Sequence, residues 1–401
     1  MGKTLLALGG GAPNFTAMTG VLRAFHEADL RIDHVSMTGG GMVAGLLYLA
    51  PKGGDRAKAL ENTVNLGVSD AIYAAFPVNY KVFQKSGRGA DRFRAMMSAN
   101  PRMRRWLDQS DMSHGQKLVS DWIQLMAAMM SPTDLNWFSQ GMCAHAPFIE
   151  EVVDFEALKR SEVGCTLGAY CLEDHKTRRF GKDEITPDAF RAGLAFPFIY
   201  PPFRFSDGKH YIEGASFHAL NLQDLITEFS NDPSPENHVD SVILIDVLRQ
   251  TLIAQPRTLW EGYSQSVITP IIGMAKKELA MFRTWIQHGV NVEEHHSRRD
   301  VVGDRKTSFK STSPLEELAA EDRAAATTRH VPLDRRPTLY EVMVTVPEDH
   351  RGDLLSWKRS NLDYLFHLGY FSGIEFARHA KAHGLFQRSS EAPEELASAA
   401  A

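Results

Sequence analysis

The residues best placed to do chemistry lie in a glycine-rich turn. It reads Met37-Thr38-Gly39-Gly40-Gly41 and stands between a short β-branched run at residues 32–36 and an apolar segment with helical spacing. This order predicts a strand, a tight turn and a helix. In many hydrolases such a turn has the pattern Gly-x-Ser-x-Gly and exposes a nucleophilic serine at the positive end of the helix. Here the spacing is kept, but Gly39 stands in the place of the serine.

A second glycine turn follows the first strand that the sequence predicts, at residues 3–8. Gly9, Gly10 and Gly11 precede a helix whose apolar residues recur at helical spacing: Phe15, Met18, Val21, Leu22 and Phe25. Glycines in such a turn let successive backbone amides converge on an anion or a developing oxyanion.

These two turns resemble the start of a patatin-like phospholipase. In that family the first turn, Gly-Gly-Gly-x-Arg/Lys-Gly, forms the oxyanion hole, and the second, Gly-x-Ser-x-Gly, carries the nucleophile. The resemblance implies that the amides of five glycines bind the oxyanion or a ligand: Gly9, Gly10, Gly11, Gly40 and Gly41. It also implies an acid in an Asp-Gly-Gly/Ala motif where a strand meets a loop.

Two acidic residues compete for that position. Asp207-Gly208 lies between two short strand candidates, and Asp-Gly is a preferred pair for a tight hairpin turn. We therefore interpret Asp207 as a hairpin tip and Glu213, followed by Gly214 and Ala215, as the residue at the family's aspartate position.

Several substitutions separate this chain from an active member, in which serine attacks the ester carbonyl and aspartate accepts its proton. Beside Gly39 and Glu213, Met37 replaces the first elbow glycine, and Pro13 and Asn14 replace the basic residue and glycine of the first turn. Proline has no N–H to donate and restricts the residue before it, so the oxyanion hole is expected to be reshaped.

Two nearby hydroxyl groups could substitute for the missing nucleophile. Thr38, directly before the elbow, is expected to point away from the cleft, and Ser36 lies deeper in the sheet. Neither is favoured as a nucleophile.

The resemblance implies a lipid acyl hydrolase or a relative that acts on or binds an acyl lipid or ester without the Ser-Asp acyl-enzyme mechanism. One alternative is altered chemistry, with Glu213 as general base on a water, because its extra methylene reaches toward the space vacated at Gly39. Another is a non-catalytic lipid-binding or regulatory protein, and a third is a hydrolase whose nucleophile was deliberately replaced by glycine. The expected partner is a lipid or acyl-ester small molecule, with no cofactor and no metal.

The fold implied by the resemblance is a patatin-like three-layer α/β/α arrangement with a mainly parallel central sheet. We expect a core at residues 1–250 with a helical insertion at about 51–134, and a C-terminal helical extension at 251–384. Residues 297–337, which are hydrophilic and lack periodicity, are expected to form a flexible insertion, and residues 385–401 a disordered tail.

Composition limits the partners. With a net charge of −5 and 23% charged residues, the chain lacks the basic balance that nucleic-acid binding uses. The insertion mixes arginines with apolar residues, which favours a solvated helix face and leaves peripheral contact with anionic lipid as the alternative. The mixture comprises Arg88, Arg92, Arg94, Arg102, Arg104 and Arg105 with Phe93, Met96, Met97, Met103 and Trp106. The first strand begins too early for a signal peptide, which predicts a cytoplasmic location.

Overall fold

The computed structural model describes residues 2–222, 225, 238–247, 253, 255–256, 259–288, 336–347, 350 and 355–386. The flexible insertion expected at 297–337 and the tail expected at 385–401 lie almost wholly outside these residues, and the expected domain boundary at residue 250 stays a prediction.

One eight-stranded mixed sheet forms the centre of the molecule, in the order β5-β6-β3-β2-β1-β7-β8, with β4 pairing β3 off this path. Its strands are β1 (Lys3–Leu8), β2 (His34–Met37), β3 (Gly164–Cys171), β4 (Lys176–Gly181), β5 (Phe203–Arg204), β6 (His210–Glu213), β7 (Val239–Asp246) and β8 (Thr338–Met343). The run from β3 to β8 is parallel, whereas β4 and β6 pair antiparallel with β3 and β5 pairs antiparallel with β6. The predicted mainly parallel α/β sheet is confirmed.

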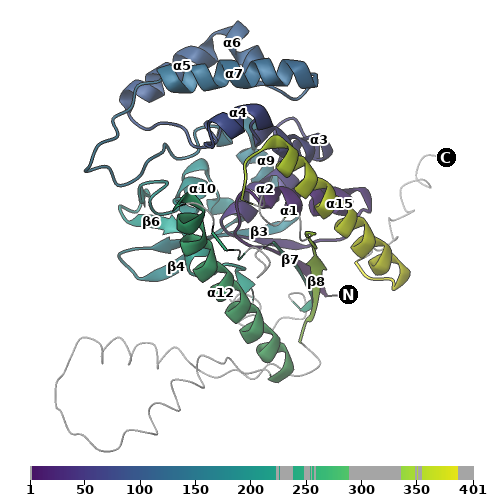
Figure 1. Ribbon diagram of the computed structural model, residues 1–401. Coiled ribbons are helices and arrows are strands. Elements are labelled where there is room, and N and C mark those ends of the chain that lie inside the picture. The colour runs from purple at the N-terminus through teal and green to yellow at the C-terminus, as the bar shows by residue number, and fades with distance from the viewer. Residues whose placement is uncertain are drawn as a thin grey trace, which may run out of the picture.

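Helices lie around this sheet, some against it and some in a further layer (Figure 1). They are α1 (Phe15–Glu27), α2 (Gly40–Leu49), α3 (Arg56–Glu61), α4 (Asp70–Ala75), α5 (Arg88–Ala99), α6 (Pro101–Leu107), α7 (His114–Met130), α8 (Ile149–Val152), α9 (Phe155–Arg160), α10 (Pro187–Gly193), α12 (Leu259–His288) and α15 (Arg359–Ala382). Every residue from Leu5 to Leu8 of β1 is at most 1% exposed, so both faces of this central strand are covered. Among the described helices, none is both long and apolar enough to cross a membrane.

The C-terminal elements complete the core. Strand β8 extends the parallel sheet beside β7, and α15 packs along α1 through glycines. A Cβ atom on Gly369 or Gly20 would overlap the backbone of the facing helix, so these positions permit the close approach.

The segment between α2 and β3 is helical, and α5, α6 and α7 form a layer of their own beyond α4 (Figure 1). A buried ionic cluster attaches this layer to the core. The Asp121 carboxylate of α7, which is fully buried, pairs with Lys81 Nζ at 2.7 Å and with Arg359 Nη2 of α15 at 3.0 Å. Gln109 and Ser69 complete its hydrogen bonds.

Asp121→Asn is expected to lower the free energy of unfolding by about 3–5 kcal/mol, because it leaves two buried cations without their counter-charge. Urea denaturation measures the change. The matched control is Glu61→Gln, whose carboxylate pairs with Arg23 at 3.0 Å but is 52% exposed; we expect a loss below about 1 kcal/mol. Equal losses in the two variants would show that the cluster does not hold the layer in place.

Candidate functional site

The turn at Gly39 has the geometry of a nucleophile elbow. Residue 39 joins β2 to α2 with φ 51° and ψ −130°, a conformation that strains any residue with a side chain and that glycine adopts freely. The strained strand-to-helix turn expected from the spacing is therefore present, although no side chain projects from it.

Helix α2 begins in close contact with the first glycine turn. A Cβ atom on Gly40 would overlap the Gly11 carbonyl oxygen, and one on Gly41 would lie 2.5 Å from the carbonyl oxygens of Gly9 and Leu8. Both glycines are thus required for this approach, which brings the two turns together.

The backbone amides of these glycines divide into two groups. The Gly10 N–H donates to Ala219 O at 2.8 Å, and the Gly41 N–H donates to Gly9 O and to Thr38 O, both at 3.0 Å. Within the described residues, the amides of Gly9, Gly11 and Gly40 donate to no backbone oxygen. The anion-binding role expected of the five glycines stays a prediction, and these amides are the ones open to a ligand oxygen.

Glu213 lies directly against Gly39. An ideal Cβ atom on Gly39 would overlap Glu213 Oε1 and would lie 3.0 Å from Ala215 Cβ and 3.1 Å from Gly10 Cα. Glu213 reaches this place as the last residue of β6, which pairs with Ala169 of β3. The carboxyl group therefore occupies the space in which a side chain at residue 39 would begin.

The Glu213 residue is 8% exposed, and no hydrogen bond or ion pair to its carboxyl group occurs among the described residues. Burial alone raises its pKa to about 8. Cys143 and Tyr200 belong to a buried cluster near it, and burial, with the charges of Cys143 and Glu213, raises the pKa of Tyr200. At neutral pH Glu213 is therefore mostly a neutral carboxylic acid in apolar surroundings.

The competing acid lies at a hairpin tip, as expected. Asp207 follows β5, Gly208 has φ 83°, and Phe205 N–H donates to Lys209 O at 2.9 Å across the turn. The Asp207 carboxylate accepts hydrogen bonds from Arg178 Nη1 and the Tyr211 hydroxyl, both at 2.7 Å. It holds the hairpin and does not face Gly39.

The two alternative hydroxyl groups are buried and are not paired with a base. Ser36 Oγ accepts a hydrogen bond from Asn221 Nδ2 at 2.7 Å. Thr38 Oγ1 has no hydrogen-bond partner among the described residues and lies 3.1 Å from the point where a Cβ on Gly214 would stand. The neighbour of Ser36 is the Asn221 amide and that of Thr38 is Gly214, and neither can accept a proton. Neither hydroxyl therefore has the base that would activate it as a nucleophile.

Two of the other substitutions have local structural counterparts. The Met37 side chain packs under α2 at Gly45, where an added Cβ would overlap its sulfur, so Gly45 makes room for the larger residue. Pro13 O accepts hydrogen bonds from the Thr16 N–H at 3.3 Å and from its hydroxyl at 3.2 Å, as α1 begins.

Sequence reasoning missed the residues that fix the wall of the site. The Glu278 carboxylate of α12 accepts hydrogen bonds from the N–H groups of Leu220 and Leu222 at 2.9 and 2.6 Å. It thereby holds the neighbouring Ala219, whose carbonyl oxygen accepts a hydrogen bond from the Gly10 N–H. No spacing in the sequence links positions so far apart. For Tyr200, the aromatic and proline-rich run at residues 196–203 was the available signal.

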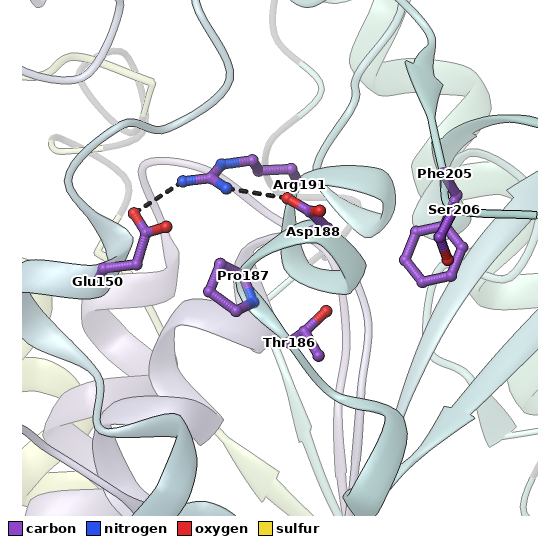
Figure 2. A pocket seen from close by; sticks show the side chains of 7 residues that line it. All are labelled: Glu150, Thr186, Pro187, Asp188, Arg191, Phe205 and Ser206. Atoms are coloured by element: carbon purple, nitrogen blue, oxygen red, sulfur yellow. Dashed lines mark hydrogen bonds and ion pairs between the residues drawn. The ribbon is translucent and has the colours of Figure 1, made fainter.

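A hollow of about 450 Å³ lies elsewhere on the surface (Figure 2). Its lining includes Arg191, which pairs with Glu150 at 2.7 Å and with Asp188 at 3.0 Å. These two carboxylates neutralise the charge of the Arg191 guanidinium. None of its lining residues is a predicted site residue. Across the described part of the chain, no three His, Cys, Asp or Glu side chains group closely enough to hold a metal ion.

Comparison with known families agrees with this geometry. Residues 6–226, more than half of the chain, match the family described as Patatin-like phospholipase. The chain belongs to the patatin-like family of lipid acyl hydrolases. Among solved structures, VipD from Legionella pneumophila is similar at 13% sequence identity, with a TM-score of 0.33, over 94% of this chain and 67% of VipD. No curated protein sequence matches the chain.

The raised pKa of Glu213 predicts a pH-dependent stability. Between pH 4.5 and about 8 the folded protein keeps a proton that the unfolded chain releases, so the free energy of unfolding falls as pH rises through this window. The slope is at most about 1.4 kcal/mol per pH unit. Glu213→Gln lacks this contribution and should gain stability relative to the unsubstituted protein from pH 5 to pH 8.5.

Urea denaturation of both proteins at pH 5, 7 and 8.5 checks this, with Asp207→Asn as the control that should show no such gain. A difference between Glu213→Gln and the unsubstituted protein that stays constant with pH would mean that Glu213 is ionised in the fold.

Proposed function

We propose that this protein binds an acyl lipid or acyl ester beside Gly39 and forms no acyl-enzyme. The observation that carries the proposal is the position of Glu213 Oε1, which fills the space where a nucleophile's side chain would start. Family membership suggests a lipid or ester as the ligand. Gly39 has no side chain that could attack an ester, so no acyl-enzyme can form at this residue.

The residues suit a ligand with a carbonyl or carboxylate group. A neutral Glu213 is a hydrogen-bond donor, and the amides of Gly11 and Gly40, near the N-terminus of α2, donate to no backbone oxygen within the described residues. Donors converging near a helix N-terminus favour an oxygen that carries partial negative charge. The apolar cluster around Tyr200 suits the neighbouring part of an acyl chain.

A second candidate function is direct hydrolysis, and the pKa of about 8 favours it. In this mechanism the Glu213 carboxylate takes a proton from water as the water's oxygen attacks the ester carbonyl carbon, and the glycine amides stabilise the developing oxyanion. The C–O bond to the alcohol then breaks and the alcohol leaves with the proton. Because the carboxylate is the active form, the rate should rise with pH up to about 8.

Labelling and turnover separate these functions. We expect no labelling by a serine-directed fluorophosphonate at residues 36–41, because neither buried hydroxyl is activated. Hydrolysis of short p-nitrophenyl esters is measured from pH 6 to 9.5 for the unsubstituted protein, Glu213→Gln and the control Asp207→Asn.

Binding without chemistry predicts background turnover in all three proteins. The general-base function predicts turnover that rises toward pH 8, falls at least about 100-fold in Glu213→Gln and is kept in Asp207→Asn. Covalent labelling of a single residue at positions 36–41, located by mass spectrometry, would contradict both functions.

A further inference from the structure

An apolar stripe runs along the outward face of α7. The α7 stripe consists of Val119, Trp122, Met126, Met129 and Met130. These residues follow the i, i+3, i+7, i+10, i+11 spacing of one helix face, and each is between 47% and 72% exposed. A surface helix normally presents polar residues at such positions, so this arrangement indicates a partner.

Two further exposed aromatic residues lie in the segment that follows α7 in the chain. Trp137 and Phe138 are essentially fully exposed, and neither side chain contributes to the apolar clusters of the described fold. Tryptophan is especially suited to an interface between water and lipid, because its ring is apolar and its N–H is polar.

The inner face of α7 is firmly packed, so the exposure of the stripe is a property of the fold. Leu125 lies in a buried cluster with Val68, Ile72 and Tyr80. Asp121, on the same inner face, is bound by the ionic cluster described above. The helix therefore has one orientation, with its stripe turned to solvent.

The charge around the stripe favours an anionic partner. Residues 81–140 contain nine Lys or Arg and five Asp, although the whole chain has a net charge of −5. Exposed arginines of α5 and α6 form no ion pair within the described residues; they are Arg88, Arg92, Arg102, Arg104 and Arg105. This segment is therefore a cationic region of an acidic protein.

The cationic helix α5 begins beside the end of the stripe. The Arg88 N–H donates to Asp134 Oδ2 at 3.1 Å, and Lys85 Nζ donates to Met129 O at 3.3 Å and Ser131 O at 2.9 Å. Figure 1 shows α5, α6 and α7 together at one end of the molecule. The helices that carry the arginines and the apolar stripe thus lie side by side.

We propose that the α7 stripe, Trp137 and Phe138 insert into the surface of an anionic lipid bilayer while the arginines of α5 and α6 contact its head groups. Apolar side chains with basic neighbours are the features that hold a helix at a membrane interface. A second copy of the chain fits less well, because two like-charged surfaces would face each other. This inference rests on the proposed function and deepens it by naming the surface from which the acyl ligand is taken.

Vesicle flotation tests the proposal on the full chain. The protein should bind vesicles that contain phosphatidylserine more tightly than pure phosphatidylcholine vesicles, and added salt should weaken the binding. The double variant Trp137→Ser/Phe138→Ser should bind at least about tenfold more weakly. Arg88→Glu/Arg92→Glu should also lose at least about tenfold, together with most of the salt dependence.

The matched control is Phe371→Ser, which removes a 63% exposed phenylalanine from α15, a helix outside the α5–α7 layer, and should leave vesicle binding unchanged. The proposal fails if the unsubstituted protein does not bind phosphatidylserine vesicles, or if Phe371→Ser weakens binding as much as the aromatic double variant. It also fails if light scattering shows a dimer that Trp122→Ser dissociates, since the stripe would then join two copies.

Failure of the proposed function gives a different result. Binding of a water-soluble short-chain acyl ester, measured without vesicles, reports on the site beside Gly39 alone. The vesicle experiment therefore tests membrane binding separately from ligand binding beside Gly39.

Discussion

The contact between Glu213 and Gly39 constrains the rest of the site. The carboxyl group fits where it does because residue 39 has no side chain, and residue 39 keeps an elbow conformation at φ 51° that glycine adopts without strain. Glycine at residue 39 and glutamate at residue 213 are therefore linked in space. The buried acid takes up a proton at neutral pH, because no cation or hydrogen-bond donor in the described residues offsets its burial.

The surrounding fold brings the two glycine turns together. Strands β3, β2, β1 and β7 run parallel, so both glycine turns lie at the C-terminal ends of neighbouring strands. Helix α2 begins at the same place. The first turn, however, has its Gly10 amide bound to Ala219 O, which Glu278 holds in place from α12. That amide is therefore not available to a developing oxyanion in this structure.

Much of this could be predicted from sequence, because glycine turns and apolar periodicity are local signals. The elbow at Gly39, the hairpin tip at Asp207 and the approach of Glu213 to Gly39 all follow from short motifs in known order. The wall of the site could not be predicted, since Glu278 and Tyr200 reach it through long-range packing. Likewise, the arginines of the insertion were visible, but only the orientation of α7 shows which apolar residues face outward.

A double-mutant cycle tests the central contact most directly. Gly39→Ser, Glu213→Asp and their combination are compared by urea denaturation with the unsubstituted protein. A serine side chain introduced at position 39 would overlap Glu213 Oε1, whereas aspartate at position 213 withdraws that oxygen by one methylene. The double variant should therefore be more stable than the two single losses predict, by about 1–3 kcal/mol. Additive losses, within about 0.5 kcal/mol, would show that the acid does not occupy the nucleophile's space.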